Sequence, residues 1–175
     1  LINIPQALDR LCYRYPAMLV DAIIEHEPGK RLVAVKNVTV NEEFFQGHFP
    51  GSPLMPAVLT LESLSQGAAI LLLESEHASP RTRVFLRGVN DAKFRRQIVP
   101  GHRVRLEISL GRRRVSMARA QATAFVGDEV VAAIRGVVRG SRRPSGTVLC
   151  GDRGGRLGDD VGALLDRTDL VAHER

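Results

Sequence analysis

The sequence predicts an α+β domain in which an antiparallel sheet of about six strands wraps around one long buried central helix. The run over residues 56–73 is apolar on nearly every side, which is typical of a helix buried in a core. Before and after this run, apolar and polar residues alternate, as they do in half-buried strands. One apolar helix between two groups of strands favours a sheet that folds around it.

Two strands are expected before the long helix. Residues 3–11 resemble a short helix with a proline early in its first turn. Residues 19–24 and 31–40 have the composition of strands, and the Pro-Gly pair within residues 27–30 indicates a turn between them. A loop rich in glycine and proline follows over residues 47–56.

The long helix is expected to begin at Pro56, because proline is favoured in the first turn of a helix. It is expected to end at residues 76–79, before Pro80. After it the pattern changes to period two, which predicts about five strand segments. These segments are residues 84–89, 94–99, 102–110, 115–125 and 129–138.

The composition changes near Gly140, which suggests where the domain ends. Residues 1–140 are predicted to form a single domain, long enough to bury a core. Residues 141–175 are rich in glycine, arginine and aspartate and have no sustained periodicity. They are interpreted as a C-terminal tail that is disordered or loosely packed, and no chemistry is assigned to them.

Several classes of protein are disfavoured by simple features of the chain. The most apolar run contains Glu62 and Gln66, which a lipid-facing helix tolerates poorly, and no secretory signal is recognised. Cys12 and Cys150 lie far apart, without a Cys/His cluster, so neither a disulfide framework nor a metal site is expected. These features favour a cytoplasmic protein that does not contact a membrane.

The formal net charge is +6, and the whole excess lies within residues 1–140. Such a field favours an acidic partner. Nucleic acid is disfavoured, because the arginines are not interleaved with aromatic residues and no groove-reading motif occurs. The alternative is a solvated strand face with arginines in its turns. The arginines cluster at residues 94–96, 103–105 and 112–114.

Glu62 interrupts the otherwise apolar helix. Burying an ionised carboxylate costs several kcal/mol, so its position calls for an explanation. It either faces a solvent gap or pairs with an arginine of the sheet, or it is an acid that stays protonated in an apolar pocket and donates a proton. Gln66, one helical turn later, lies on the same face and could hydrogen-bond to the carboxyl group.

His48 lies in the stiff glycine- and proline-rich loop, among three phenylalanines. An isolated histidine in a loop is usually just exposed. Held in a rigid and apolar loop, however, an imidazole can act as a general base at physiological pH.

Four segments occur in order between about residues 11 and 138: RYPAMLVDAI, EPGKRLVAVKNVTVNE, FFQGHFPGSPLMPAVLTLESLSQ and FRRQIVPG. Together they resemble the FabZ-type 3-hydroxyacyl-acyl-carrier-protein dehydratases, which have the hotdog fold. The resemblance implies conversion of a (3R)-3-hydroxyacyl-acyl-carrier protein to the trans-2-enoyl thioester, in fatty acid biosynthesis or a related acyl or polyketide pathway.

The resemblance also implies roles for individual residues. His48 would remove the proton next to the thioester carbonyl, and Glu62 would protonate the departing hydroxyl group. The backbone N–H of Ala57, at the start of the helix, would polarise the carbonyl. Gly51 and Gln66 would support substrate binding.

The family resemblance implies an assembly and a partner as well. The histidine and the carboxylate of one pocket come from different subunits, so a homodimer or a trimer of dimers is expected. The partner would be the acidic acyl-carrier protein, and Arg95 and Arg96 would contribute to its docking. No metal or redox cofactor is implied.

The chain departs from the family pattern at several positions. Ala57 replaces the usual glycine, which adds a methyl group where the substrate approaches. Cys12-Tyr13 replaces Pro-His, Ala17 replaces an aromatic residue, and the tail after Gly140 is longer than usual. Two alternatives therefore stay open: a hotdog acyl thioesterase, and a non-catalytic acyl-binding or regulatory hotdog protein.

Overall fold

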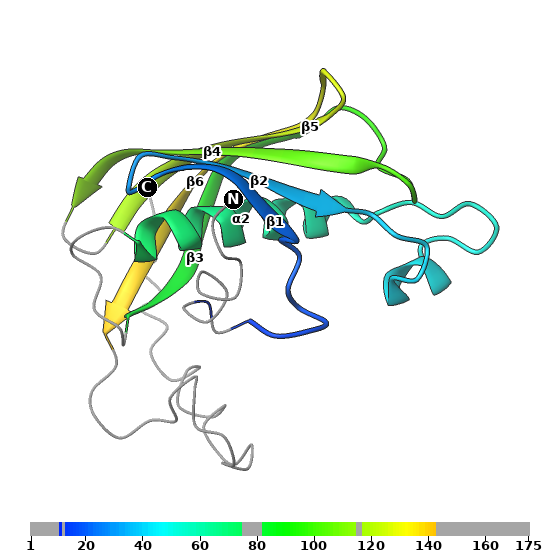
Figure 1. Ribbon diagram of the computed structural model, residues 1–175, viewed down its shortest axis with the longest axis horizontal. Coiled ribbons are helices and arrows are strands. Elements are labelled where there is room, and N and C mark those ends of the chain that lie inside the picture. The colour runs from blue at the N-terminus through cyan, green and yellow to red at the C-terminus, as the bar shows by residue number, and fades with distance from the viewer. Residues whose placement is uncertain (1–10, 12, 75–81, 115–116, 143–175) are drawn as a thin grey trace, which may run out of the picture.

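A six-stranded antiparallel sheet curves over a single long helix in the computed structural model (Figure 1). The structure describes residues 11, 13–74, 82–114 and 117–142. The strand order across the sheet is β1-β2-β4-β5-β6-β3. The elements are β1 (Ala22–Glu27), β2 (Arg31–Asn37), the 3-10 helix η1 (Glu43–Gln46), the helix α2 (Ala57–Leu73), β3 (Thr82–Phe94), β4 (Arg103–Arg114), β5 (Met117–Val126) and β6 (Glu129–Arg142).

This architecture confirms the predicted α+β class, with six strands and one buried α-helix among the described residues. The helix expected over residues 3–11 and the tail beyond residue 142 lie outside the described residues. β6 continues to Arg142, two residues past the predicted domain boundary. The division into a domain and a tail stays a prediction.

The strand expected over residues 94–99 is wrong. β3 is one long strand that ends at Phe94, where the chain leaves the sheet. The backbone N–H of Arg95 still reaches the carbonyl of Val131. Further on, the carbonyl of Ile98 accepts the N–H of Met55, so this segment pairs with the loop before α2 instead of with a strand.

Most of the predicted element ends also differ from the structure, and three of them have an identifiable hydrogen-bond partner or cap. α2 ends at Leu73, earlier than expected, and Glu74 is its C-cap. The first strand begins at Ala22, and the N–H of Leu19, which precedes it, bonds to the side chain of Gln66. The second strand ends at Asn37, after which the N–H of Val38 bonds to the carbonyl of His102.

The core lies between α2 and the concave face of the sheet. The second half of the helix is buried on all sides, as its apolar composition predicts. The helix packs closely against β4 at Gly67, because glycine has no side chain there. A Cβ atom at this position would lie 2.6 Å from Cδ1 of Ile108 on β4. The helix therefore sits deep in the sheet, which fixes the position of its first turns.

β3 is an edge strand of the sheet and carries exposed large apolar side chains. From residue 85 to residue 90 both of its faces are exposed in the single chain. An exposed apolar edge offers unpaired backbone groups and apolar side chains to another strand. Its exposed large apolar side chains are Phe85, Leu86, Val89 and Phe94.

Candidate active site

His48 is held by the backbone of its own loop. Its backbone N–H bonds to the carbonyl of Phe44 in η1, at 3.0 Å. Its carbonyl accepts the N–H of Leu54 at 2.9 Å, and its ring Nδ1 lies 2.7 Å from the carbonyl oxygen of Leu54. A carbonyl only accepts, so Nδ1 carries a proton, and in the neutral imidazole the free lone pair is then on Nε2. The ring also stacks on Phe49, with centroids 4.1 Å apart.

Gly51 makes the tight turn that lets the loop close on itself. Its φ of +76° lies in the left-handed region that favours glycine. Phe49 and Ser52 exchange backbone hydrogen bonds across this turn, at 3.0 and 3.2 Å. Gly51 is not among the described residues that line the cavity next to His48. Its contribution is therefore to the path of the loop, and direct substrate contact stays a prediction.

A cavity of about 330 Å³ lies beside His48 and the start of α2; we call it the base cavity. Ala57 is the first residue of α2, and the first N–H groups of a helix have no partner within the helix. They also lie at the positive end of the helix dipole. The base cavity is lined by His48, Leu54, Met55, Ala57, Thr60, Phe94, Arg95, Arg96, Gln97, Ile98, Val131 and Ala132.

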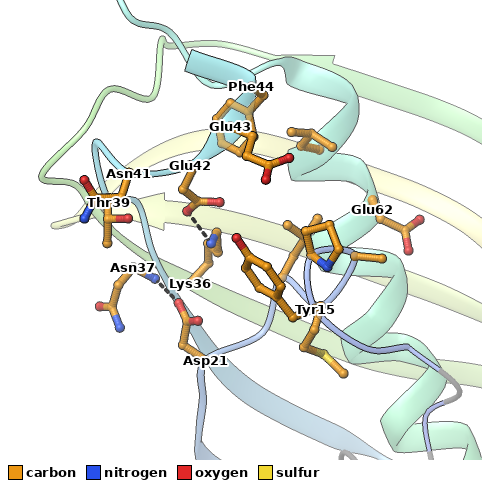
Figure 2. Close-up of a pocket in the computed structure, with 15 residues that line it drawn as sticks. Tyr15, Asp21, Lys36, Asn37, Thr39, Asn41, Glu42, Glu43, Phe44 and Glu62 are labelled. Atoms are coloured by element: carbon orange, nitrogen blue, oxygen red, sulfur yellow. Dashed lines mark hydrogen bonds and ion pairs between the residues drawn. The ribbon is translucent and has the colours of Figure 1, made fainter. Parts of the chain in front are cut away.

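Glu62 lies on α2 and lines a second, larger cavity of about 790 Å³, which we call the acid cavity. Figure 2 shows Glu62 at one end of this cavity and the polar residues Asn37, Thr39 and Asn41 at the other. The remaining lining residues are Tyr15, Pro16, Ala17, Met18, Leu19, Asp21, Lys36, Glu42, Glu43, Phe44 and Leu59.

Gln66 lies fully buried behind Glu62, with 0% of its surface exposed. Its Nε2 donates to Oε1 of Glu62 at 3.0 Å and to the carbonyl of Ala17 at 2.7 Å. Its Oε1 accepts the N–H of Leu19 at 2.9 Å. One amide thus holds both the carboxyl group and the segment that forms one wall of the acid cavity.

The two cavities lie on opposite sides of the same helical turns. Successive residues of an α-helix are rotated by about 100°. Ala57 and Thr60 therefore lie on one side, facing the base cavity, whereas Leu59 and Glu62 lie on the other. Among the described residues of one chain, His48 and Glu62 line separate cavities.

Arg95 and Arg96 lie at the exposed rim of the base cavity, but their surroundings differ. Nε of Arg96 pairs with Oε2 of Glu129 at 2.9 Å, and both side chains are 61% exposed. Within the described part of the chain, no carboxylate pairs with Arg95. Arg95 is thus the more available of the two for an acidic partner.

Sequence reasoning missed a buried ion pair in the acid cavity. Nζ of Lys36 pairs with Oε1 of Glu42, and their side chains are only 6% and 17% exposed. The alternation in the second strand places Lys36 among inward-facing positions, and this was the available signal.

The described residues contain no group of three or more His, Cys, Asp or Glu side chains that could hold a metal ion. No helix in this part of the chain is long and apolar enough to cross a membrane.

A sheet curved around one helix, with a loop histidine and a helix carboxyl group in recesses at the start of that helix, defines a protein of the hotdog-fold class. Solved structures support this fold at low sequence identity. A chain of the dehydratase heterocomplex ApeI:P from Xenorhabdus doucetiae matches with a TM-score of 0.62 and 11% identity, over 78% of this chain and 91% of that one. Zebra fish thioesterase superfamily member 2 matches with a TM-score of 0.55 and 11% identity, over 69% and 80%.

Sequence comparison then specifies the family. The model of the FabA-like domain matches residues 11–135. The 3-hydroxyacyl-acyl-carrier-protein dehydratase FabZ of Pediococcus pentosaceus is 44% identical over 131 residues, which is 75% of this chain and 87% of that protein. The FabZ of Alkaliphilus metalliredigens is 49% identical over 118 residues, 67% of this chain and 80% of that protein. The chain therefore belongs to the FabA-like family and, within it, to the FabZ-type dehydratases.

Proposed function

We propose that the chain dehydrates (3R)-3-hydroxyacyl-acyl-carrier protein to the trans-2-enoyl thioester in fatty acid biosynthesis, with His48 as the base and Glu62 as the acid. The similarity to the FabZ enzymes supports the reaction. The observation that carries the assignment of the base is the bond between Nδ1 of His48 and the carbonyl of Leu54. In the neutral imidazole this bond places the free lone pair on Nε2, and His48 lines the same cavity as the amide end of α2.

The base cavity contains the groups needed to form a carbanion next to a thioester. Nε2 of His48 would take the proton from C2, and the electron pair of that C–H bond would move toward the carbonyl. The N–H of Ala57 would stabilise the negative charge on the carbonyl oxygen, helped by the helix dipole. Ala57 lines the base cavity, so its methyl group would narrow the space in which the thioester carbonyl approaches the helix N-terminus.

Glu62 would complete the elimination at C3. As the C3–O bond breaks, the carboxyl group gives its proton to the departing hydroxyl, and water leaves. The electron pair from C2 forms the double bond, and the proton on His48 later returns to Glu62. Because Gln66 donates to Oε1, that oxygen is already an acceptor, and we assign the transferred proton to Oε2.

The base and the acid of one active site would come from two chains. This explains why they line opposite sides of α2 in a single chain. The exposed apolar edge strand β3 offers a surface on which a second copy can pair by a two-fold axis. Each dimer would then contain two active sites. Arg95 and Arg96, at the rim of the base cavity, would receive the acidic acyl-carrier protein.

Purified protein should convert 3-hydroxybutyryl-acyl-carrier protein to a product with enoyl-thioester absorbance. His48→Ala and Glu62→Gln should each lower kcat by roughly 10²–10⁴-fold, because each removes a positioned base or acid. Circular dichroism and thermal unfolding should show that both variants remain folded. Parental turnover in both variants would refute the assignment of these residues. Release of free thiol without enoyl product would refute the dehydratase reaction.

A further inference from the structure

The ion pair of Lys36 and Glu42 is unusual because both charges are largely shielded from water: the lysine side chain is 6% exposed and the glutamate side chain 17%. Figure 2 shows the lysine ammonium and the glutamate carboxylate in contact at the wall of the acid cavity. Burying such a pair is often no more favourable than packing two apolar side chains of similar size. Its presence therefore calls for an explanation other than stability. One explanation is that the pair fixes the position of one segment of the chain relative to another.

The pair joins the sheet to the segment that leads to His48. Lys36 lies near the end of β2, which is an interior strand held by β1 on one side and β4 on the other. Glu42 is the N-cap of η1, and its carbonyl accepts the N–H of Phe45, which is buried in the core. The lysine thus anchors the point where η1 begins.

A hydrogen bond connects η1 directly to the backbone of His48. The carbonyl of Phe44 accepts the backbone N–H of His48 at 3.0 Å. Phe44 itself lines the acid cavity, whereas His48 lines the base cavity. The short η1 segment therefore lines the acid cavity and also holds the backbone of His48, which lines the base cavity. A shift of Glu42 would move η1 and, with it, the base.

We propose that Lys36 and Glu42 are positioning residues, whose ion pair holds η1 so that the imidazole of His48 points into the base cavity. This inference rests on the proposed function, because it assigns the pair a role in the rate of dehydration. The pair acts through His48, and neither of its residues lines the base cavity.

The test compares Lys36→Met, Glu42→Gln and the double variant Lys36→Met/Glu42→Met with the wild-type enzyme. Removing one partner leaves the other charge buried and alone, so the single changes should lower stability. The double variant should regain most of that stability. Its kcat should still be lower by roughly 10- to 100-fold, with KM for the carrier-bound substrate unchanged, because a small misplacement of the base is costly.

A matched control exists on the surface. Lys30 and Glu27 form an i,i+3 pair of the same chemistry, with side chains 75% and 57% exposed. Lys30→Met removes the same charge from an exposed pair, so the thermal stability should be nearly unchanged. Its kcat should stay within about twofold of the wild-type value. A general effect of lost positive charge would appear in this control as well.

A second readout reports on the imidazole itself. The proton on Nδ1 of His48, bonded to Leu54, should give a distinct NMR resonance that is absent in His48→Ala. It should shift or broaden in the double variant and in Glu42→Gln, and stay unchanged in Lys30→Met. Glu42→Gln is nearly isosteric and keeps the test open if the double variant does not fold.

The outcomes separate the two proposals. If the wild-type protein does not dehydrate the substrate, the proposed function fails, and the resonance alone decides whether the pair positions His48. If the wild-type protein is active, recovery of kcat together with stability in the double variant overturns the positioning role. An unmoved resonance in the folded variants also overturns it.

Discussion

The two cavities at the start of α2 are constructed by different means. In the base cavity, His48 is fixed by hydrogen bonds to the backbone carbonyl of Leu54 and by the closed loop around Gly51. In the acid cavity, Glu62 and the neighbouring wall are both held by one side chain, that of Gln66. The base is therefore held directly by backbone groups of its own loop and of η1, whereas the acid is held by a single buried amide. The two cavities should respond differently to substitution.

The largest expected effect tests whether the two cavities act across a pair of chains. His48→Ala and Glu62→Gln are each expected to be nearly inactive as pure dimers. When the two are mixed and allowed to exchange subunits, half of the dimers are hybrids, and each hybrid has one complete site. Activity should return to about a quarter of the wild-type value.

Native mass spectrometry of the mixture provides the control, since it shows whether hybrid dimers form. Hybrids without recovered activity would mean that His48 and Glu62 of different chains do not share a site. A monomeric wild-type protein with full activity would refute the shared site altogether.

A smaller loss is expected from Gln66→Leu. The carbonyl of Ala17 and the N–H of Leu19 lose their partner, which should lower the free energy of unfolding by about 1–3 kcal/mol. The carboxyl group of Glu62 also loses its fixed orientation, so kcat should fall roughly 10-fold or more. Thermal unfolding and steady-state kinetics measure the two effects.

Gln121 on β5 is exposed, so Gln121→Leu serves as the matched control and should leave both quantities unchanged. If Gln66→Leu keeps the wild-type kcat while losing stability, Gln66 supports the wall of the acid cavity only. The proposed difference between the two cavities would then disappear.

The smallest expected effect concerns the rim of the base cavity. Arg95→Glu should raise KM for the carrier-bound substrate several-fold, because charge complementarity governs such encounters. Arg96→Glu should have a weaker effect, since Glu129 already pairs with Arg96 in the free protein. Steady-state kinetics at low salt would measure both values.

A small acyl-thioester mimic is the control, because it lacks the acidic carrier. Its KM should be the same for both variants and the wild type. Equal effects on the mimic and on the carrier-bound substrate would refute the docking role. Lys30→Glu, which changes the net charge equally on an exposed turn, should leave both KM values unchanged.

Much of the fold could be predicted from local patterns. The helix over residues 57–73 was recognisable because apolar residues on every side leave it no stable position except a core. The strands were recognisable from alternation, but their ends were not. The segment after Phe94 has a strand-like composition, yet it bonds to Val131 and Met55 and leaves the sheet. Such choices depend on partners that are distant in sequence.

The sequence by itself determined the buried helix, the alternating strands and the stiff loop, because each follows from residues that are neighbours along the chain. It also supplied His48 and Glu62 as the residues to consider. Only the tertiary structure decided that these two line separate cavities and that Gln66 bonds to Ala17 and Leu19. It also decided that Lys36 pairs with Glu42 where both are largely shielded from water. The physical reason is that burial and hydrogen bonding depend on which segments pack together.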